Sequence, residues 1–106
     1  MQTVHIRHSD KGAVTIVYDV SDGVISYGAA LCSPKDNFCR RIGREIATRR
    51  LGNKYLSGEI CATEHPHHDD IVFRVLSDIL VKVDYPTNLE PLIYRELWRR
   101  LSILGG

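Results

Sequence analysis

The sequence predicts a single α+β domain, in which an antiparallel meander of strands is packed by three amphipathic helices. Two patterns predict this class. Apolar residues alternate with period two over the first third of the chain, and they recur with helical spacing over much of the rest. The 106 residues suit one core, and the hydrophobic (43%) and charged (25%) fractions are those of an ordinary globular protein. We therefore expect one domain over residues 1–106.

Three strands account for the alternation, at about 2–8, 13–20 and 24–32. Val14, Ile16 and Tyr18 would share one face of the second strand. Asp22 and Gly23 follow, and both tolerate the positive φ that a two-residue hairpin turn needs. Residues 55–61 form either a fourth strand or a connection. The sheet should therefore have three to four antiparallel strands.

A first helix is predicted at about 34–51. Ser33 suits the N-cap, Pro34 suits the first helical position, and Asp36 completes a capping box. Gly43 costs about 1 kcal/mol relative to alanine inside a helix, so we expect it to permit close packing. The residues expected to face the sheet are Phe38, Ile42, Ile46 and Ala47.

Two further helices are predicted at about 70–83, capped by Asp69 or Asp70, and at about 88–104, capped by Thr87 or Asn88. Each carries an apolar stripe that must be buried on the sheet, on the other helix or on a second copy of the chain, so a homodimer stays open. The stripes comprise Ile71, Val72, Val75, Leu76, Ile79, Leu80 and Val83, and then Leu89, Leu92, Ile93, Leu97, Leu101 and Leu104.

Positive charge is concentrated on the first predicted helix. The chain has a formal net charge of +1, yet residues 35–54 carry a balance of +5 and residues from 55 onward one of −3. With the backbone N–H groups at residues 33–36, this surface would favour phosphate, carboxylate or an acidic protein surface. The alternative is a solvated face that pairs with acidic residues of the C-terminal half. The candidate binding residues are Lys35, Arg40, Arg41, Arg44, Arg49, Arg50 and Lys54.

A second candidate surface lies on the last predicted helix. It combines the aromatic and arginine side chains that are enriched among interface residues carrying most of the binding energy. The alternative is that Trp98 belongs to the core and the arginines form a hydrated helix end. The candidate interface residues are Tyr94, Arg95, Trp98, Arg99 and Arg100.

The stretch EHPHHDD at 64–70 is rich in potential metal ligands, but it lacks the two separated, rigidly placed ligand pairs of a zinc site. We expect no metal, and the role of the His65–Asp70 loop stays open. The sequence also has no glycine-rich phosphate loop, nucleophile elbow or His-Glu-x-x-His pair. We therefore expect neither an enzyme nor a bound cofactor.

The location of the protein is expected to be cytoplasmic. No apolar run approaches the roughly 20 residues that span a bilayer, and the N-terminus lacks the basic-then-apolar profile of a secretory signal. Three cysteines do not make a disulfide framework, which agrees with a reducing compartment.

The segment YGAALCSPKDNFCRRIGREIATRRL (27–51), about a quarter of the chain, resembles a segment of small bacteriophage and prophage proteins. In these, a strand ending Gly-x-Ala-x-Cys-x-Pro-x-Asp-x-Phe runs into a helix with the pattern Gly-x-x-Ile-Ala-x-x-Arg-Leu. The layout also resembles that of double-stranded-RNA-binding domains, although no helix precedes the first strand and Asp36 stands where those domains have lysines. The resemblance implies this topology and a phage origin. The matching residues are Gly28, Ala30, Cys32, Pro34, Asp36, Phe38, Gly43, Ile46, Ala47, Arg50 and Leu51.

We expect an inhibitor of a host defence protein or ribonucleoprotein complex, similar to the proteins that phages use against CRISPR effectors. Such a protein needs only a folded scaffold and a complementary surface. One alternative is a nucleic-acid-binding module, for which a pI of about 7.8 is low. The other is a protein that sequesters a nucleotide signal, with the anion held at the helix start and a dimer interface supplying the pocket.

Overall fold

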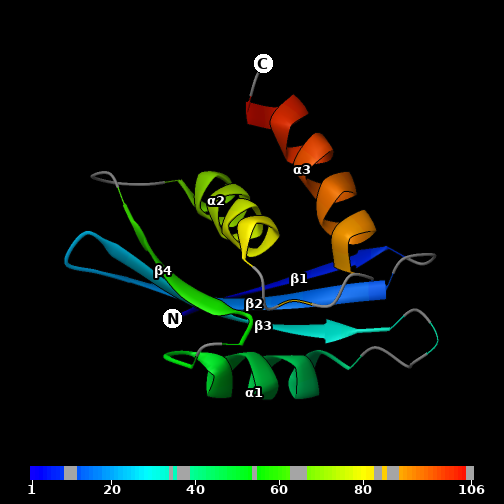
Figure 1. Cartoon of the computed structure of the whole chain (residues 1–106), viewed down its shortest axis with the longest axis horizontal. Coiled ribbons are helices and arrows are strands. Elements are labelled where there is room, and N and C mark those ends of the chain that lie inside the picture. Colours follow the sequence, from blue (N-terminus) through cyan, green and yellow to red (C-terminus); the bar gives the residue numbers. More distant parts are fainter. Residues whose placement is uncertain are drawn as a thin grey trace.

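The described part of the chain has the predicted α+β fold. The computed structural model describes residues 1–8, 12–33, 35, 39–53, 55–62, 67–82, 85 and 89–104, with side chains as far as residue 101. Helix α1 lies on one face of the sheet, and helices α2 and α3 lie on the other (Figure 1). In chain order the elements are β1 (Gln2–His8), β2 (Gly12–Ser21), β3 (Val24–Cys32), α1 (Arg40–Arg50), β4 (Ser57–Cys61), α2 (His68–Val81) and α3 (Glu90–Leu104).

The sheet is a four-stranded antiparallel meander in the order β1-β2-β3-β4. The predicted turn between β2 and β3 is confirmed: Ser21 pairs with Val24, and the two residues between them have φ values of 53° (Asp22) and 74° (Gly23). The fourth strand, which the sequence left open, pairs with β3 over Ser57–Cys61. The edge strands are β1 and β4, and β2 and β3 form the centre of the sheet, on which α1 packs.

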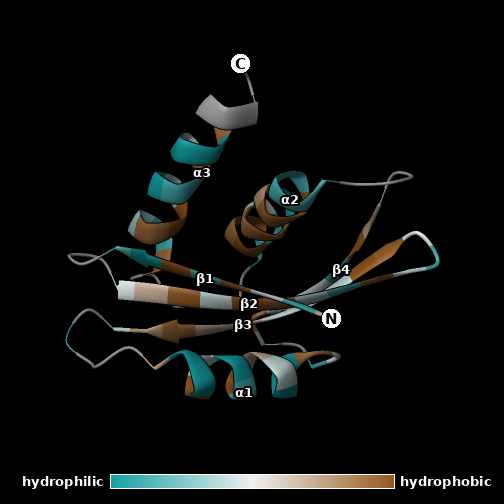
Figure 2. Cartoon of the chain, turned by 180° about the vertical axis from the view of Figure 1, so that it is seen from behind, coloured by the Kyte–Doolittle hydropathy of each residue, from teal (hydrophilic) through white to brown (hydrophobic). Residues whose placement is uncertain are grey.

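The main hydrophobic core lies between the sheet and the layer formed by α2 and α3, where Figure 2 shows hydrophobic residues facing one another. Because side chains alternate along a strand, Ile16 and Tyr27 point into this core while their neighbours point toward α1. Each large side chain buried in this way contributes roughly 1.5–3 kcal/mol. Leu89, which directly precedes α3, adds to this core, and the helices contribute Ile71, Val72, Val75, Leu76, Ile79, Leu92 and Ile93.

Helix α1 approaches the sheet closely because small residues line the contact. A Cβ atom built on Gly43 would lie 2.5 Å from Thr15 Oγ1, which confirms the close packing predicted for this glycine. On the strand side, a Cβ built on Gly28 would lie 2.2 Å from the carbonyl oxygen of Ala47. Helix and sheet are therefore fixed at a separation that admits only hydrogen at these two positions.

The predicted start of the first helix was wrong. Helix α1 begins at Arg40, after an extended N-cap residue, Cys39 (φ −127°, ψ 114°), that provides no side-chain cap. The hydroxyl of Ser33 accepts a hydrogen bond from the backbone N–H of Lys35 over 3.2 Å, which forms a local turn instead of a helix cap. Ile42, expected on the sheet, is 50% exposed because Gly43 makes that contact. Pro34, Asp36 and Phe38 lie outside the described residues.

The other helix boundaries differ less from the prediction. The N-cap of α2 is His67, and Asp69 and Asp70 fall in its first turn, where their charges favour the positive end of the helix. The described part of α3 begins at Glu90. The caps predicted for it, Thr87 and Asn88, lie outside the described residues.

Candidate functional site

The first candidate surface is the outer side of α1. We call Arg40, Arg41, Arg44 and Arg49 the α1 basic face; all four are exposed. Within the described residues, no carboxylate forms an ion pair with any of them. The first turn of α1 contains no acidic residue. Its arginines lie at the positive end of the helix dipole, where positive charge is unfavourable. The outer side of α1 is largely hydrophilic (Figure 2), and these guanidinium groups are available to an anionic partner.

The remaining cations predicted for this surface lie elsewhere or have other partners. Arg50 Nη1 donates to the carbonyl oxygen of Ala29 over 2.8 Å, and its guanidinium carbon lies 4.8 Å from the centroid of the Tyr55 ring. Arg50 therefore ties the end of α1 to the sheet. Lys35 is exposed, but it precedes α1, and Lys54 lies outside the described residues.

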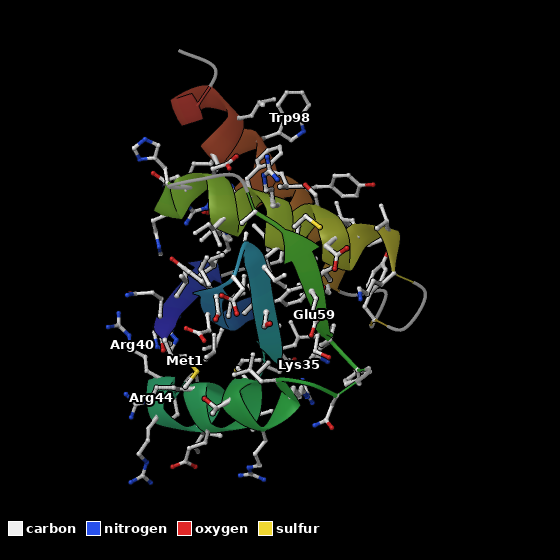
Figure 3. All side chains as sticks on the ribbon, turned by 90° about the vertical axis from the view of Figure 1, so that its left-hand side faces the viewer. Met1, Lys35, Arg40, Arg44, Glu59 and Trp98 are labelled. Atoms are coloured by element: carbon white, nitrogen blue, oxygen red, sulfur yellow. The ribbon has the colours of Figure 1, made fainter. Side chains whose placement is uncertain are left out.

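A histidine that the sequence did not single out belongs to the same surface. His5, on β1, points to the α1 side of the sheet, and its Nδ1 lies 2.9 Å from Thr15 Oγ1. Burial lowers the pKa of His5, and the positive charges of Arg40 and Arg44 lower it further. Figure 3 shows both arginines on one side of α1. The sequence could have placed His5 on this side, because side chains alternate along a strand and His5 lies between the apolar residues Val4 and Ile6.

Helix α3 carries charge on its inner face. The side chain of Glu96 is 2% exposed, and it lies 3.0 Å from Arg100 Nε and 3.1 Å from His8 Nε2. Arg99 also donates hydrogen bonds to it. Burial would raise the pKa of Glu96, but its bonds with Arg99 and His8 and the charge of Arg100 outweigh burial and lower the pKa. Arg100 was predicted as an interface residue, but it is 6% exposed and also pairs with Asp69. It therefore belongs to a buried network of ion pairs.

The outer face of α3 is apolar. Trp98 is 70% exposed, Tyr94 53% and Leu101 47%, which rules out the alternative that Trp98 belongs to the core and shows that the burial expected for Leu101 was wrong. Figure 3 shows Trp98 at the periphery of the molecule. A shallow cavity of about 210 Å³ lies here, with almost entirely apolar walls. We call it the α3 groove, and its lining residues are Phe73, Tyr94, Leu97, Trp98 and Leu101.

Two exposed arginines accompany the α3 groove. Arg95 and Arg99 follow Tyr94 and Trp98 directly in the sequence, so they lie along one flank of the aromatic stripe. The side chain of Arg99 is 55% exposed even though it binds Glu96. One flank of the α3 groove therefore carries arginines, and the groove itself is lined by apolar side chains.

Other observations bear on the expected chemistry. Among the described residues, no group of three or more His, Cys, Asp or Glu side chains could hold a metal ion; residues 63–66 of the histidine loop lie outside them. No helix in the described ranges is long and apolar enough to cross a membrane. Comparisons with protein-family models, curated proteins and solved structures give no significant match.

Proposed function

We propose that this protein is a non-enzymatic binding protein that inhibits a host defence complex, as anti-CRISPR proteins do, in the host cytoplasm. The observation that carries the proposal is the inverted arrangement of α3, whose carboxylate Glu96 is buried while its tryptophan, Trp98, is exposed. The part of the proposal that concerns host defence depends on the resemblance of residues 27–51 to phage proteins.

The α3 groove has the composition of a binding hot spot. Tryptophan, tyrosine and arginine carry most of the energy at protein interfaces, and an anchor gains most where a cavity excludes water around it. Trp98 and Tyr94 supply rigid aromatic area beside such a cavity. Since the walls of the α3 groove are apolar, the matching partner segment carries apolar side chains that fill it.

The α1 basic face supports the same function in a different way. It lies on the face of the sheet opposite to α3 (Figure 1), so it does not line the groove. Exposed charges contribute little to affinity, but they attract a partner of opposite sign and accelerate association at low salt. The positive charge of the α1 basic face would attract a host complex that has an acidic protein surface or bound RNA.

The test is a capture experiment with matched variants. The chain is immobilised, host lysate is passed over it, and the partner is identified and then purified for calorimetry. We expect Trp98→Ala to weaken the partner's affinity by about thirtyfold or more. Ile42→Ala, which removes a half-exposed apolar side chain from α1, is the control and should change affinity by less than about threefold.

Two results with the captured partner would refute this function. One is a partner that binds Trp98→Ala and wild type equally; the other is a purified host complex whose activity is unchanged by saturating protein. If the chain instead forms a dimer that Trp98→Ala dissociates, measured by light scattering, the α3 groove is an interface between two copies and the inhibitor proposal fails.

A nucleic-acid-binding function is the second candidate, and the unpaired arginines of the α1 basic face favour it. If those arginines bind phosphates, the affinity for generic RNA or DNA falls steeply as salt rises. The number of phosphates bound is read from the slope of log affinity against log salt, and four contacts would give a slope of about −3 to −4. Absence of binding at low salt excludes this candidate.

A further inference from the structure

We propose that Arg40 and Arg44 of α1, together with His5 of β1, form a binding site for a dianionic phosphate group such as the terminal phosphate of a nucleotide. This site goes beyond the partner binding proposed above, because it takes a small ligand on the opposite face of the sheet from the α3 groove.

The position of the three side chains follows from the fold. Helix α1 packs on the central strands β2 and β3, so the α1-facing side chains of the edge strand β1 lie beside the helix. Arg40 and Arg44 are one helical turn apart and therefore project to the same side. Thr15 Oγ1, which hydrogen-bonds to His5, also lies against Gly43 of α1, so His5 sits beside the turn of the helix that carries Arg40 and Arg44.

The described charged side chains nearest to His5 are arginines. From β1, Arg7 shares its face of the sheet; from α1 come Arg40 and Arg44; from β2 comes the neutral hydroxyl of Thr15. The β2 carboxylate on that face, Asp19, is four residues further along the strand and lies 3.9 Å from the N-terminal ammonium group. Within the described residues, no carboxylate forms an ion pair with Arg40 or Arg44, and this includes the exposed Glu45 of the same helix.

A phosphate dianion matches this cluster better than a carboxylate does. Each guanidinium presents a planar fork of N–H donors that fits two phosphate oxygens, and two arginines with a protonated histidine offset both negative charges. A single carboxylate supplies one charge and two oxygens, which one arginine already satisfies.

Ligand binding must then be linked to the protonation of His5. In the free protein the pKa of His5 lies below its usual value of 6.5. A bound dianion favours the charged imidazolium and raises that pKa. By linkage, the affinity for the phosphate dianion increases as the pH falls through the range between the bound and free pKa values of His5.

The experiment uses the full chain at low salt, with inorganic phosphate, adenosine monophosphate and a single-stranded oligonucleotide without terminal phosphates as probes. Calorimetry at pH 6 and pH 8 compares wild type with the double variant Arg40→Ala, Arg44→Ala. The matched control is Arg41→Ala, Arg49→Ala, which removes the same charge from the same helix. NMR follows the pKa of His5 in each protein, with and without phosphate.

We expect the Arg40–Arg44 double variant to bind phosphate and adenosine monophosphate about tenfold more weakly or worse, and the control less than about threefold more weakly. Phosphate should raise the pKa of His5 in the wild type and in the control. The Arg40–Arg44 variant should start from a higher pKa of His5 in the free protein and show no such rise. His5→Gln should lose the part of the pH dependence that comes from His5 and keep the part that comes from the second ionisation of the ligand, whose pKa is about 6.

Three outcomes would overturn the proposal: no binding of either phosphate probe at pH 6, equal losses in the two double variants, or binding of the oligonucleotide alone. The last two would indicate a diffuse basic field. Because Trp98 lies on the other side of the sheet, Trp98→Ala should leave phosphate binding unchanged, so failure of this site and failure of partner binding are separate results.

Discussion

Oε2 of Glu96 lies 3.1 Å from Nε2 of His8, and this contact joins the middle of α3 to the end of β1 across 88 residues of sequence. Arg99 and Arg100 bind the same carboxylate from α3, and Arg100 extends the network to Asp69 at the start of α2. The three elements therefore meet at one buried negative charge.

The first prediction concerns that charge. Glu96→Gln keeps the size of the side chain but leaves the buried guanidinium of Arg100 with Asp69 as its remaining carboxylate. Loss of one member of a buried ion pair typically costs about 3–5 kcal/mol, and the remaining bond to Asp69 places our expectation at about 3 kcal/mol. Urea unfolding measures it. The exposed Glu45→Gln on α1 is the control, expected within about 0.5 kcal/mol of wild type.

The second prediction is the pH dependence of the same network. The pKa of Glu96 is lower in the folded protein than its usual value of 4.5. Its contribution to the free energy of unfolding is therefore complete above pH 4.5 and is lost as the pH falls through the folded pKa. We expect the stability difference between wild type and Glu96→Gln to shrink steadily below pH 4.5. A difference that stays constant from pH 7 to acid would show that Glu96 does not titrate with folding.

The fold class and the β2–β3 hairpin could be predicted from the sequence because they depend on local patterns: alternation of apolar residues and an Asp22-Gly23 turn. The start of α1 could not. Ser33 and Pro34 have the local chemistry of a helix start, but α1 begins six residues after Pro34, at Arg40. Its first turns are those in which Gly43 lies against Thr15 of β2. The position at which α1 begins is therefore set by its packing on the sheet, which the local sequence does not reveal.

The arrangement of α3 was missed for a related reason. Leucine spacing placed Leu97 and Leu101 in the core, but Leu101 is exposed while Leu97 packs against the core, and Arg100 was expected at an interface. The observed helix is rotated, since the partners of Glu96 and Arg100 include His8 and Asp69, which are remote in sequence. A buried ion network leaves no periodic signature, so neither the exposed aromatic stripe nor the α3 groove could be derived from spacing alone.

The third prediction concerns the separation between α1 and the sheet. Gly28→Ala places a methyl group 2.2 Å from the carbonyl oxygen of Ala47 and 2.9 Å from the backbone nitrogen of Leu51. Backbone atoms cannot rotate away, so α1 must move, and we expect a loss of at least about 2 kcal/mol by urea unfolding. Ser26→Ala, on the same strand and facing the same side, is the control and should change stability by less than about 0.5 kcal/mol. A Gly28→Ala protein as stable as wild type would contradict the close contact.

The fourth prediction separates binding from stability on α3. Trp98 is 70% exposed, so Trp98→Ala should lower the free energy of unfolding by less than about 1 kcal/mol. Leu92→Ala, in the core on the same helix, should cost about 2–5 kcal/mol. Trp98 is the single tryptophan of the chain, so its fluorescence reports on this site alone. We expect the emission of a hydrated indole that iodide quenches readily, and protection from iodide once a partner occupies the α3 groove. If the free protein already protects Trp98 from iodide, the groove is closed in solution and cannot be the docking surface.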